Sequence, residues 1–159
     1  QLPSFEDYSM KNRTYRYFTG TPLYPFGYGL SYTKFAYSKL TLPTTAVKAG
    51  EPMTAEVTVT NTGKVAGDEV AQLYLNFPKV AGAPLRALRG FERVHLAPGE
   101  SKTVQFRLRS RDMSMVTEAG EPIVAEGYYS VSVGGGQPGT QAPIVEGGFD
   151  VAGKMYLPE

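Results

Sequence analysis

The strongest constraint on the fold is a nine-residue stretch, Met53–Asn61, in which apolar and polar side chains alternate without a break. Met53, Ala55, Val57 and Val59 fall on one face, and threonine or glutamate occupies the other. Successive side chains of a β-strand point to opposite faces, so this period of two predicts a strand with one buried and one solvated face.

Further short β runs follow along the chain, separated by turns rich in Gly, Pro and Asn, and no segment shows a helical period. We predict a turn at 48–52 and place Val104, Phe106 and Leu108 on one inward face, with Tyr129 and Val133 on another. Strands spaced by about 8–12 residues are typical of a β-sandwich. The predicted strands are 35–42, 53–61, 70–77, 88–96, 101–108, 123–125, 127–133 and, as an edge strand, 149–151.

Composition excludes several classes of protein. The 159 residues fit one domain plus an extension, and 16 Lys and Arg against 15 Asp and Glu leave no strongly basic face for nucleic acid. No apolar run approaches the length of about 18 residues that a transmembrane helix needs. Cysteine and tryptophan are absent, which rules out a thiolate metal site and disulfides. The absence of a Cys–Trp–Cys centre favours a fibronectin type III-like sandwich over an antibody-like one.

Residues 1–34, which we call the aromatic lead, differ from the rest of the chain. They are irregular in pattern and interleave aromatic residues with Pro and Gly. A buried Tyr or Phe removes about 150–250 Å² from water, so these side chains are expected to pack between domains. The alternative is an exposed platform on which sugar rings stack. The residues expected at an interdomain contact are Tyr15, Tyr17, Phe18, Tyr24, Phe26 and Tyr28.

The run PLYPFGYGLSYTKF, Pro22–Phe35, resembles the segment that leads into the C-terminal domain of glycoside hydrolase family 3 enzymes. Val59–Leu75, Pro84–Leu108 and Gly127–Gly134 are similar to later strands of the same domain, in the same order. The final 25 residues match nothing in the family. The resemblance implies two parts: an interdomain lead, 1–34, and an all-β, fibronectin type III-like antiparallel sandwich, 35–159.

The resemblance also implies a function. The family contains retaining, exo-acting β-glycosidases that release terminal β-D-glucosyl or β-D-xylosyl residues, with an Asp nucleophile on a barrel domain and a Glu acid/base on an α/β sandwich. Neither catalytic motif occurs here. We therefore expect an accessory domain without catalytic residues, metal or cofactor, which stabilises the catalytic domains of a parent enzyme. A free-standing carbohydrate-binding or adhesion sandwich is the alternative.

The expected partners follow from this assignment: the upstream barrel and α/β domains, and through them a β-glycoside or oligosaccharide substrate. The sequence leaves a homodimer open. It gives no reason to expect a nucleic acid or a membrane as a partner. A secreted or periplasmic parent is favoured over a cytoplasmic one.

A few residues could in principle carry chemistry of their own, but their pattern favours solvated or paired positions. Asp68 and Glu69 are adjacent, so on a strand they would point to opposite faces and are expected to solvate a hairpin. Glu118, Glu121 and Glu126 are expected to be solvated as well. The single histidine, His95, cannot build the usual zinc cage, and we expect it to be solvated or paired across strands.

The connection Asn76–Ala87 is long for a sandwich and is the one loop with an expected indirect role. It carries Phe77, Lys79 and Arg86, and such loops often bear function on a rigid scaffold. Bordering the substrate entrance is the functional interpretation. A solvated crossover between the two sheets is the alternative.

Overall fold

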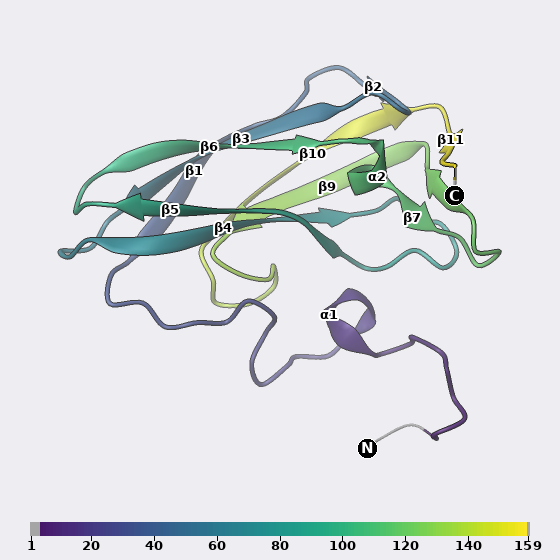
Figure 1. Cartoon of the computed structure of the whole chain (residues 1–159), viewed down its shortest axis with the longest axis horizontal. Coiled ribbons are helices and arrows are strands. Elements are labelled where there is room, and N and C mark those ends of the chain that lie inside the picture. Colours follow the sequence, from purple (N-terminus) through teal and green to yellow (C-terminus); the bar gives the residue numbers. More distant parts are fainter. Residues whose placement is uncertain (1–3, 159) are drawn as a thin grey trace.

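The computed structural model describes residues 4–158, so residues 1–3 and 159 of the two predicted segments lie outside the described residues. The chain folds into a β-sandwich with an irregular N-terminal segment along one side (Figure 1). One layer is a three-stranded sheet of order β1-β3-β6, and the other is a five-stranded sheet of order β2-β10-β9-β4-β5. A small sheet, β11-β8-β7, lies at one end. The predicted all-β sandwich is confirmed.

The strands are short and mostly antiparallel, with one parallel pair between β2 and β10. Residues 4–158 also contain two single-turn helices, one before the first strand and one between β6 and β7. The elements are α1 (Thr14–Tyr17), β1 (Phe35–Thr41), β2 (Val47–Lys48), β3 (Met53–Asn61), β4 (Gly67–Asn76), β5 (Ala87–Leu96), β6 (Ser101–Leu108), α2 (Ser110–Met113), β7 (Met115–Val116), β8 (Pro122–Val124), β9 (Gly127–Gly134), β10 (Ile144–Ala152) and β11 (Met155–Tyr156).

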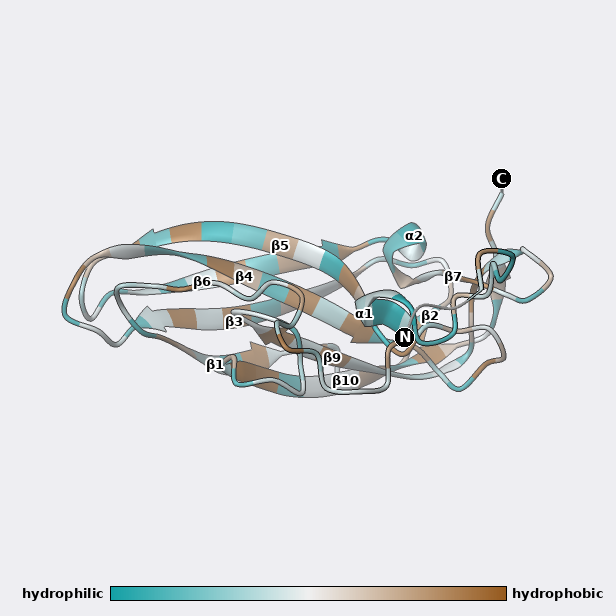
Figure 2. Ribbon diagram, turned by 90° about the horizontal axis from the view of Figure 1, so that it is seen from below, coloured by the Kyte–Doolittle hydropathy of each residue, from teal (hydrophilic) through white to brown (hydrophobic). Residues whose placement is uncertain are grey.

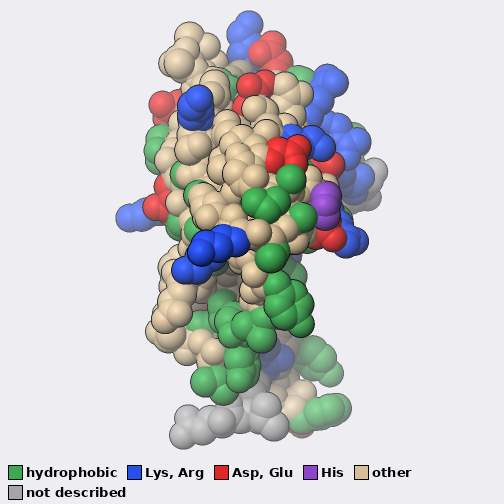
Figure 3. Space-filling view, turned by 90° about the vertical axis from the view of Figure 1, so that its left-hand side faces the viewer, with side chains coloured by type: hydrophobic (Ala, Val, Ile, Leu, Met, Phe, Trp, Pro, Cys, Tyr) green, Lys and Arg blue, Asp and Glu red, His purple; other side chains and the backbone are tan. Residues whose placement is uncertain are grey.

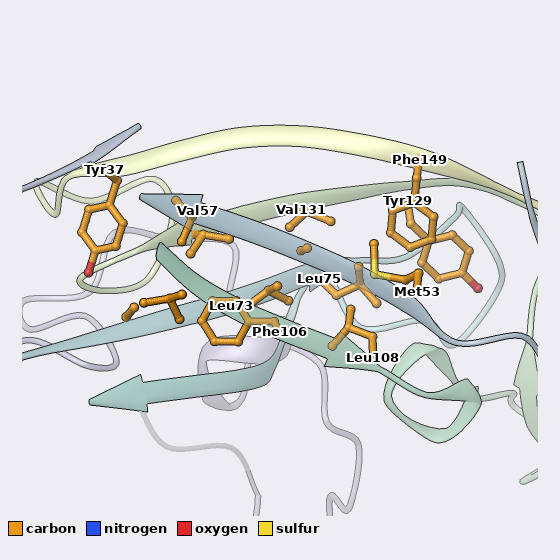
Figure 4. Packing of buried hydrophobic residues seen from close by; sticks show 14 of the residues in the cluster. Tyr37, Met53, Val57, Leu73, Leu75, Phe106, Leu108, Tyr129, Val131 and Phe149 are labelled. Carbon is orange, nitrogen blue, oxygen red and sulfur yellow. The ribbon is translucent and has the colours of Figure 1, made fainter. Parts of the chain in front are cut away.

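The core lies between the two larger sheets, as the bands of hydrophobic residues along the strands indicate (Figure 2). The alternation predicted for β3 is confirmed, because its odd-numbered positions from 53 to 61 are all buried. Val104, Phe106 and Leu108 of β6 point inward as predicted. Tyr129 of β9 stacks on Phe149 of β10 with ring centroids 5.5 Å apart (Figure 4).

The structure corrects the sequence-based assignment at several places. The predicted edge strand 149–151 is wrong: β10 is nine residues long, pairs with β9 along eight positions, and has β2 on its other side. Gly147 and Gly148 weaken the strand pattern there, although the sheet accommodates them. The predicted turn 48–52 overlaps β2, and β4 begins at Gly67 rather than at residue 70. The helices α1 and α2 each span only four residues, too few to show a helical period.

The aromatic lead runs along the sandwich beside the five-stranded sheet (Figure 1). Backbone hydrogen bonds hold it at two points: the N–H of Leu85 donates to the carbonyl of Arg16 (2.8 Å), and the N–H of Thr62 donates to that of Lys34 (2.8 Å). The lead therefore covers part of the outer face of β4, which would otherwise face solvent.

Candidate functional site

The inner part of the aromatic lead is built around Tyr15. Its ring stacks on Phe26 with centroids 4.4 Å apart and meets the edge of Tyr74 at 6.2 Å. Its hydroxyl accepts a hydrogen bond from the N–H of Leu88 (3.1 Å). Tyr74 belongs to β4 but points away from the sandwich core, so Tyr15 is what buries its outer face. These contacts fix one side of the lead to the sandwich.

Gly27 lets the lead approach β4 closely. It has a φ of +79°, and a Cβ at this position would lie 2.6 Å from Oε1 of Gln72. Only glycine combines this backbone conformation with so little space. As a result Gln72, a polar residue on the outer face of β4, is only 8% exposed. Gln72 in turn accepts a hydrogen bond from the hydroxyl of Tyr74 (2.7 Å).

The outer part of the lead exposes a large apolar surface. Tyr24, Phe26 and Tyr28 remain 69%, 47% and 56% exposed, and the rings of Tyr24 and Tyr28 lie 5.2 Å apart. In Figure 3 hydrophobic side chains gather on the lower part of the molecule, whereas charged side chains spread over the sandwich above. Contiguous exposed patches of this kind mark interaction surfaces. Neighbouring side chains that share this exposure are Phe18, Leu23, Leu30 and Tyr32.

A cavity of about 710 Å³ lies between the lead and the β9–β10 connection. Most residues of the lead from Thr21 to Lys34, together with Phe35, line one side, and Glu69 with most residues from Gly135 to Pro143 lines the other. Gln137 is 6% exposed, and its Oε1 accepts a hydrogen bond from the N–H of Phe26 (3.2 Å). This bond joins the two sides of the cavity. The cavity has aromatic, amide and carboxylate groups in its wall.

Glu69 corrects an expectation from the sequence. It does not solvate the hairpin but is partly buried, and its Oε1 accepts a hydrogen bond from the hydroxyl of Tyr37 (2.6 Å). Burial raises the pKa of the Glu69 carboxyl above its ordinary value, although the hydrogen bonds from Tyr37 and from the backbone of Val70 oppose this shift. Burial and the neighbouring Glu69 likewise raise the pKa of Tyr37.

Asp68, on the opposite face of β4, behaves as predicted. Its carboxylate accepts hydrogen bonds from Arg93 (2.6 Å) and from Nδ1 of His95 (2.9 Å) on the neighbouring strand. The Arg93 guanidinium, and after it His95, hold the pKa of Asp68 below its ordinary value. Asp68 and Glu69 therefore point apart, and this pair cannot flank a glycosidic bond. The expected cross-strand pairing of His95 is confirmed.

The three residues singled out in the connection Asn76–Ala87 have different surroundings. Phe77 packs against both the main core and a second cluster formed by Met115, Ile123 and Ala125. Lys79 is exposed. Arg86 donates to the carbonyl of Pro138 (2.7 Å), next to the cavity wall, whereas neither Phe77 nor Lys79 lines that cavity. The structure does not bring the three together, and their effect on substrate stays a prediction.

The other carboxylates singled out in the sequence form no further site within the described part of the chain. Glu118, Glu121 and Glu126 are exposed, as expected from the sequence. Among residues 4–158, no group of three or more His, Cys, Asp and Glu side chains lies close enough to hold a metal ion. Neither of the two helices in this described part is long and apolar enough to cross a membrane.

Sequence reasoning missed several residues that build this surface. Gln137 and Gln72 carry no motif, and their roles arise only because the lead folds back across β4. Arg16 and Arg89 also escaped notice, since isolated arginines on an irregular segment and a strand suggest solvated positions. Packing of the six aromatic residues against another domain stays a prediction, but two of them, Tyr15 and Phe26, also contact the chain's own sandwich.

A family model described as "Fibronectin type III-like domain" matches residues 69–137. The match extends from within β4 to just beyond β9, and the sandwich of this chain has a fibronectin type III-like fold. This class of domain defines the fold but not the activity.

The relatives are glycosidases. A β-xylosidase of Formosa agariphila is 44% identical over 76% of this chain, and a probable β-glucosidase I of Aspergillus flavus is 42% identical over 95% of it. The solved β-glucosidase 3B of Thermotoga neapolitana in complex with glucose has a TM-score of 0.79 and 34% identity over 91% of this chain. The resemblance to β-glucosidases and β-xylosidases of family 3 is confirmed. The chain spans only 17–19% of the length of these relatives.

Proposed function

We propose that this chain is the C-terminal accessory domain, with its interdomain lead, of a retaining, exo-acting family 3 β-glycosidase that releases terminal β-D-glucosyl or β-D-xylosyl residues. One observation carries the proposal. The chain aligns along 95% of its length with a β-glucosidase, and the alignment covers only 18% of that relative. The chemistry would then belong to the remaining part of the parent enzyme.

The aromatic lead supports a bracing role for the domain. Residues 1–34 would pack on the barrel and α/β domains of the parent, and 35–159 would form the sandwich that holds the lead in place. The inner side of the lead is fixed by Tyr15, while Tyr24 and Tyr28 keep most of their surface exposed. A surface fixed on one side and apolar on the other is suited to a permanent contact with another domain.

A non-catalytic carbohydrate-binding module is the second candidate. The 710 Å³ cavity favours it, because aromatic rings and amide groups lie together in its wall. The two candidates make opposite statements about Tyr24 and Tyr28: a bracing lead buries them against protein, whereas a binding module leaves them free for sugar. Binding of cellobiose or xylobiose to the chain alone, lost on Tyr24→Ala, would favour the module.

Activity measurements on three proteins test the proposal. The polypeptide that contains this chain together with its upstream sequence should hydrolyse nitrophenyl β-glucoside or β-xyloside. The 159-residue chain alone should show no turnover, because Asp68 and Glu69 face apart and each already has other partners. The upstream part alone should lose its activity at a lower temperature than the whole. Turnover by the chain alone, after removal of any full-length enzyme, would contradict the proposal.

A further inference from the structure

Three arginines gather where the aromatic lead crosses the sandwich, and we call Arg16, Arg86 and Arg89 the arginine cluster. The carbonyl of Arg16 accepts the N–H of Leu85, next to Arg86. The hydroxyl of Tyr15 accepts the N–H of Leu88, next to Arg89. Arg16 in α1, Arg86 just before β5 and Arg89 in β5 thus belong to the two segments that these bonds join beside Tyr15.

The guanidinium groups of this cluster lack anionic partners. Within residues 4–158 none of the three forms an ion pair with a carboxylate. Arg86 donates to the carbonyl of Pro138 (2.7 Å), and Arg89 donates to that of Ser114 (2.7 Å). Each bond uses one of the five N–H donors of a guanidinium, and a carbonyl does not neutralise its charge.

Burial makes the missing partners costly. The Nε atoms of Arg16, Arg86 and Arg89 are shielded from solvent and have no hydrogen-bond acceptor within the described chain. Burial and, after it, the neighbouring Arg16 lower the pKa of Arg89, although Asp112 and Tyr15 oppose this shift. A buried donor without an acceptor loses its hydration without replacement. The cluster is therefore a partly desolvated, positively charged region whose three Nε–H groups have no acceptor within residues 4–158.

A carboxylate fits this point best. Its two oxygens match the planar fork of a guanidinium, and arginine is preferred over lysine where such pairs are buried at interfaces. Asn76 lies beside Arg86, because Leu75 pairs with Ala87, and its Oδ1 is also buried without a partner. Rotation of this amide by 180° would replace the oxygen by an NH₂ donor and add to the site.

We propose that the arginine cluster docks an Asp or Glu side chain of the adjoining catalytic domain, so that an ion pair as well as apolar contact holds the lead to the parent enzyme. This rests on the proposed function, which supplies the adjoining domain. The position fits the role, since α1 lies in the lead between the sandwich and the exposed aromatic surface. The carboxylate would remove the Arg16–Arg89 repulsion and satisfy donors that the chain itself leaves unmet.

Arg16 gives the cleanest test, because within residues 4–158 its side chain makes no hydrogen bond to protein. Arg16→Gln should lower the Tm of the full-length enzyme by at least about 2 °C at 0.05 M NaCl. The deficit should shrink at 0.5 M NaCl, because salt screens the pair. In the 159-residue chain alone, the same change should leave Tm unchanged or raise it, since it removes a repelling charge. Arg16→Lys should fall between wild type and Arg16→Gln in the full-length enzyme.

Arg107→Gln is the matched control, since Arg107 is exposed on β6 in the other sheet and should alter Tm in neither context. An equal loss of Tm on Arg16→Gln in both contexts would overturn the proposal in favour of a packing role. No loss of Tm in the full-length enzyme would overturn it too.

A Tm loss that depends on protein concentration would assign the carboxylate to a second copy of the chain. Another outcome would assign the cluster to a free anion. In it, 20 mM inorganic phosphate raises the Tm of the wild-type chain alone but not that of its Arg16→Gln variant, and Arg16→Gln does not lower the Tm of the full-length enzyme. Either outcome would reject the interdomain pair. Failure of the wild-type full-length protein to hydrolyse β-glycosides would instead reject the proposed function.

Discussion

The hydroxyl of Tyr129 forms two hydrogen bonds to the backbone inside the sandwich. It donates to the carbonyl of Ala125 (2.9 Å) and accepts the N–H of the same residue (3.0 Å). The ring is fully buried and stacks on Phe149, and Phe77 meets its edge at 6.0 Å. The sequence predicted that Tyr129 points inward, because it alternates with polar residues. It could not predict the bond to Ala125, because that depends on how the chain turns between β8 and β9.

Tyr129→Phe should therefore cost more than its small change in size suggests. It would leave both polar groups of the Ala125 backbone buried without a partner, which costs about 1–3 kcal/mol. Chemical denaturation of the wild type and the variant measures the difference. Tyr128→Phe is the control, because Tyr128 is 57% exposed and its loss of a hydroxyl should change stability by less than about 0.5 kcal/mol. Equal stability of Tyr129→Phe and wild type would contradict this account of the contact.

Glu69 should make stability depend on pH. Its pKa in the folded chain is raised above the ordinary value of 4.5, so the fold favours the neutral carboxyl. The stability that Glu69 contributes is complete below pH 4.5 and is lost as the pH rises through the folded pKa. The Tm of wild type minus that of Glu69→Gln should fall between pH 4 and pH 7. If the Tm difference between wild type and Glu69→Gln instead rises with pH, the fold favours the charged carboxylate of Glu69, which would contradict this prediction.

At the scale of elements, strict alternation predicted the bounds of β3 and β6, whereas the start of β4 and the length of β10 were not predictable. β3 and β6 each bury one face, so their pattern carries a period of two. β4 is covered on both faces, by the core and by the lead, and its burial is continuous over residues 71–75. β10 contains two glycines and depends on its neighbours for pairing. Tertiary contacts determine the bounds and burial of such strands, and the residue pattern within one strand carries no information about those contacts.

Asn61 links three of these elements. It is fully buried at the end of β3, and its Nδ2 donates to the carbonyls of Val65 (2.9 Å) and Leu96 (3.0 Å). Its Oδ1 accepts from the N–H of Gly63 (3.0 Å) and from the hydroxyl of Thr33 (2.7 Å) at the end of the lead. The sequence indicated a turn here but not this number of contacts.

Asn61→Ala should destabilise the sandwich by at least about 1–3 kcal/mol, because it leaves several buried groups without partners. Urea denaturation followed by circular dichroism gives the value. Thr62→Ala, next in the chain but exposed, removes one weaker hydroxyl bond to Lys34 and should cost less than about 1 kcal/mol. If both variants lose the same stability, the turn itself and not the Asn61 network determines the effect.

At the scale of the whole molecule, the lead is the part that the sandwich alone does not account for. The sequence predicted that its aromatic residues pack against a large surface, and the structure assigns part of that surface to β4 through Tyr15 and Tyr74. The remainder could not be derived from pattern, because an irregular segment has no periodicity that assigns its side chains to a face. Tyr24, Phe26 and Tyr28 thus define both the proposed contact with the parent enzyme and its test.

Phe26→Ala should have different effects in the two contexts. In the full-length enzyme it should cost about 3–5 kcal/mol if the ring becomes fully buried. In the chain alone it should cost less, since Phe26 is 47% exposed and loses mainly its stacking on Tyr15, worth about 0.5–1.5 kcal/mol. Tyr156→Ala, at an exposed position on β11, should cost little in either. Equal costs of Phe26→Ala in both proteins would mean that the lead packs on its own sandwich only.

Amide hydrogen exchange of residues 18–32 tests the central claim most directly, because it reports contact along the lead without any substitution. Few of these amides are bonded within the chain, namely Phe18 to Thr14, Phe26 to Gln137 and Tyr28 to Pro25. The account predicts fast exchange of this segment in the 159-residue chain and exchange slowed by at least about tenfold in the full-length enzyme. Exchange at the same rate in both proteins would contradict the claim that the lead is the surface through which this domain braces a β-glycosidase.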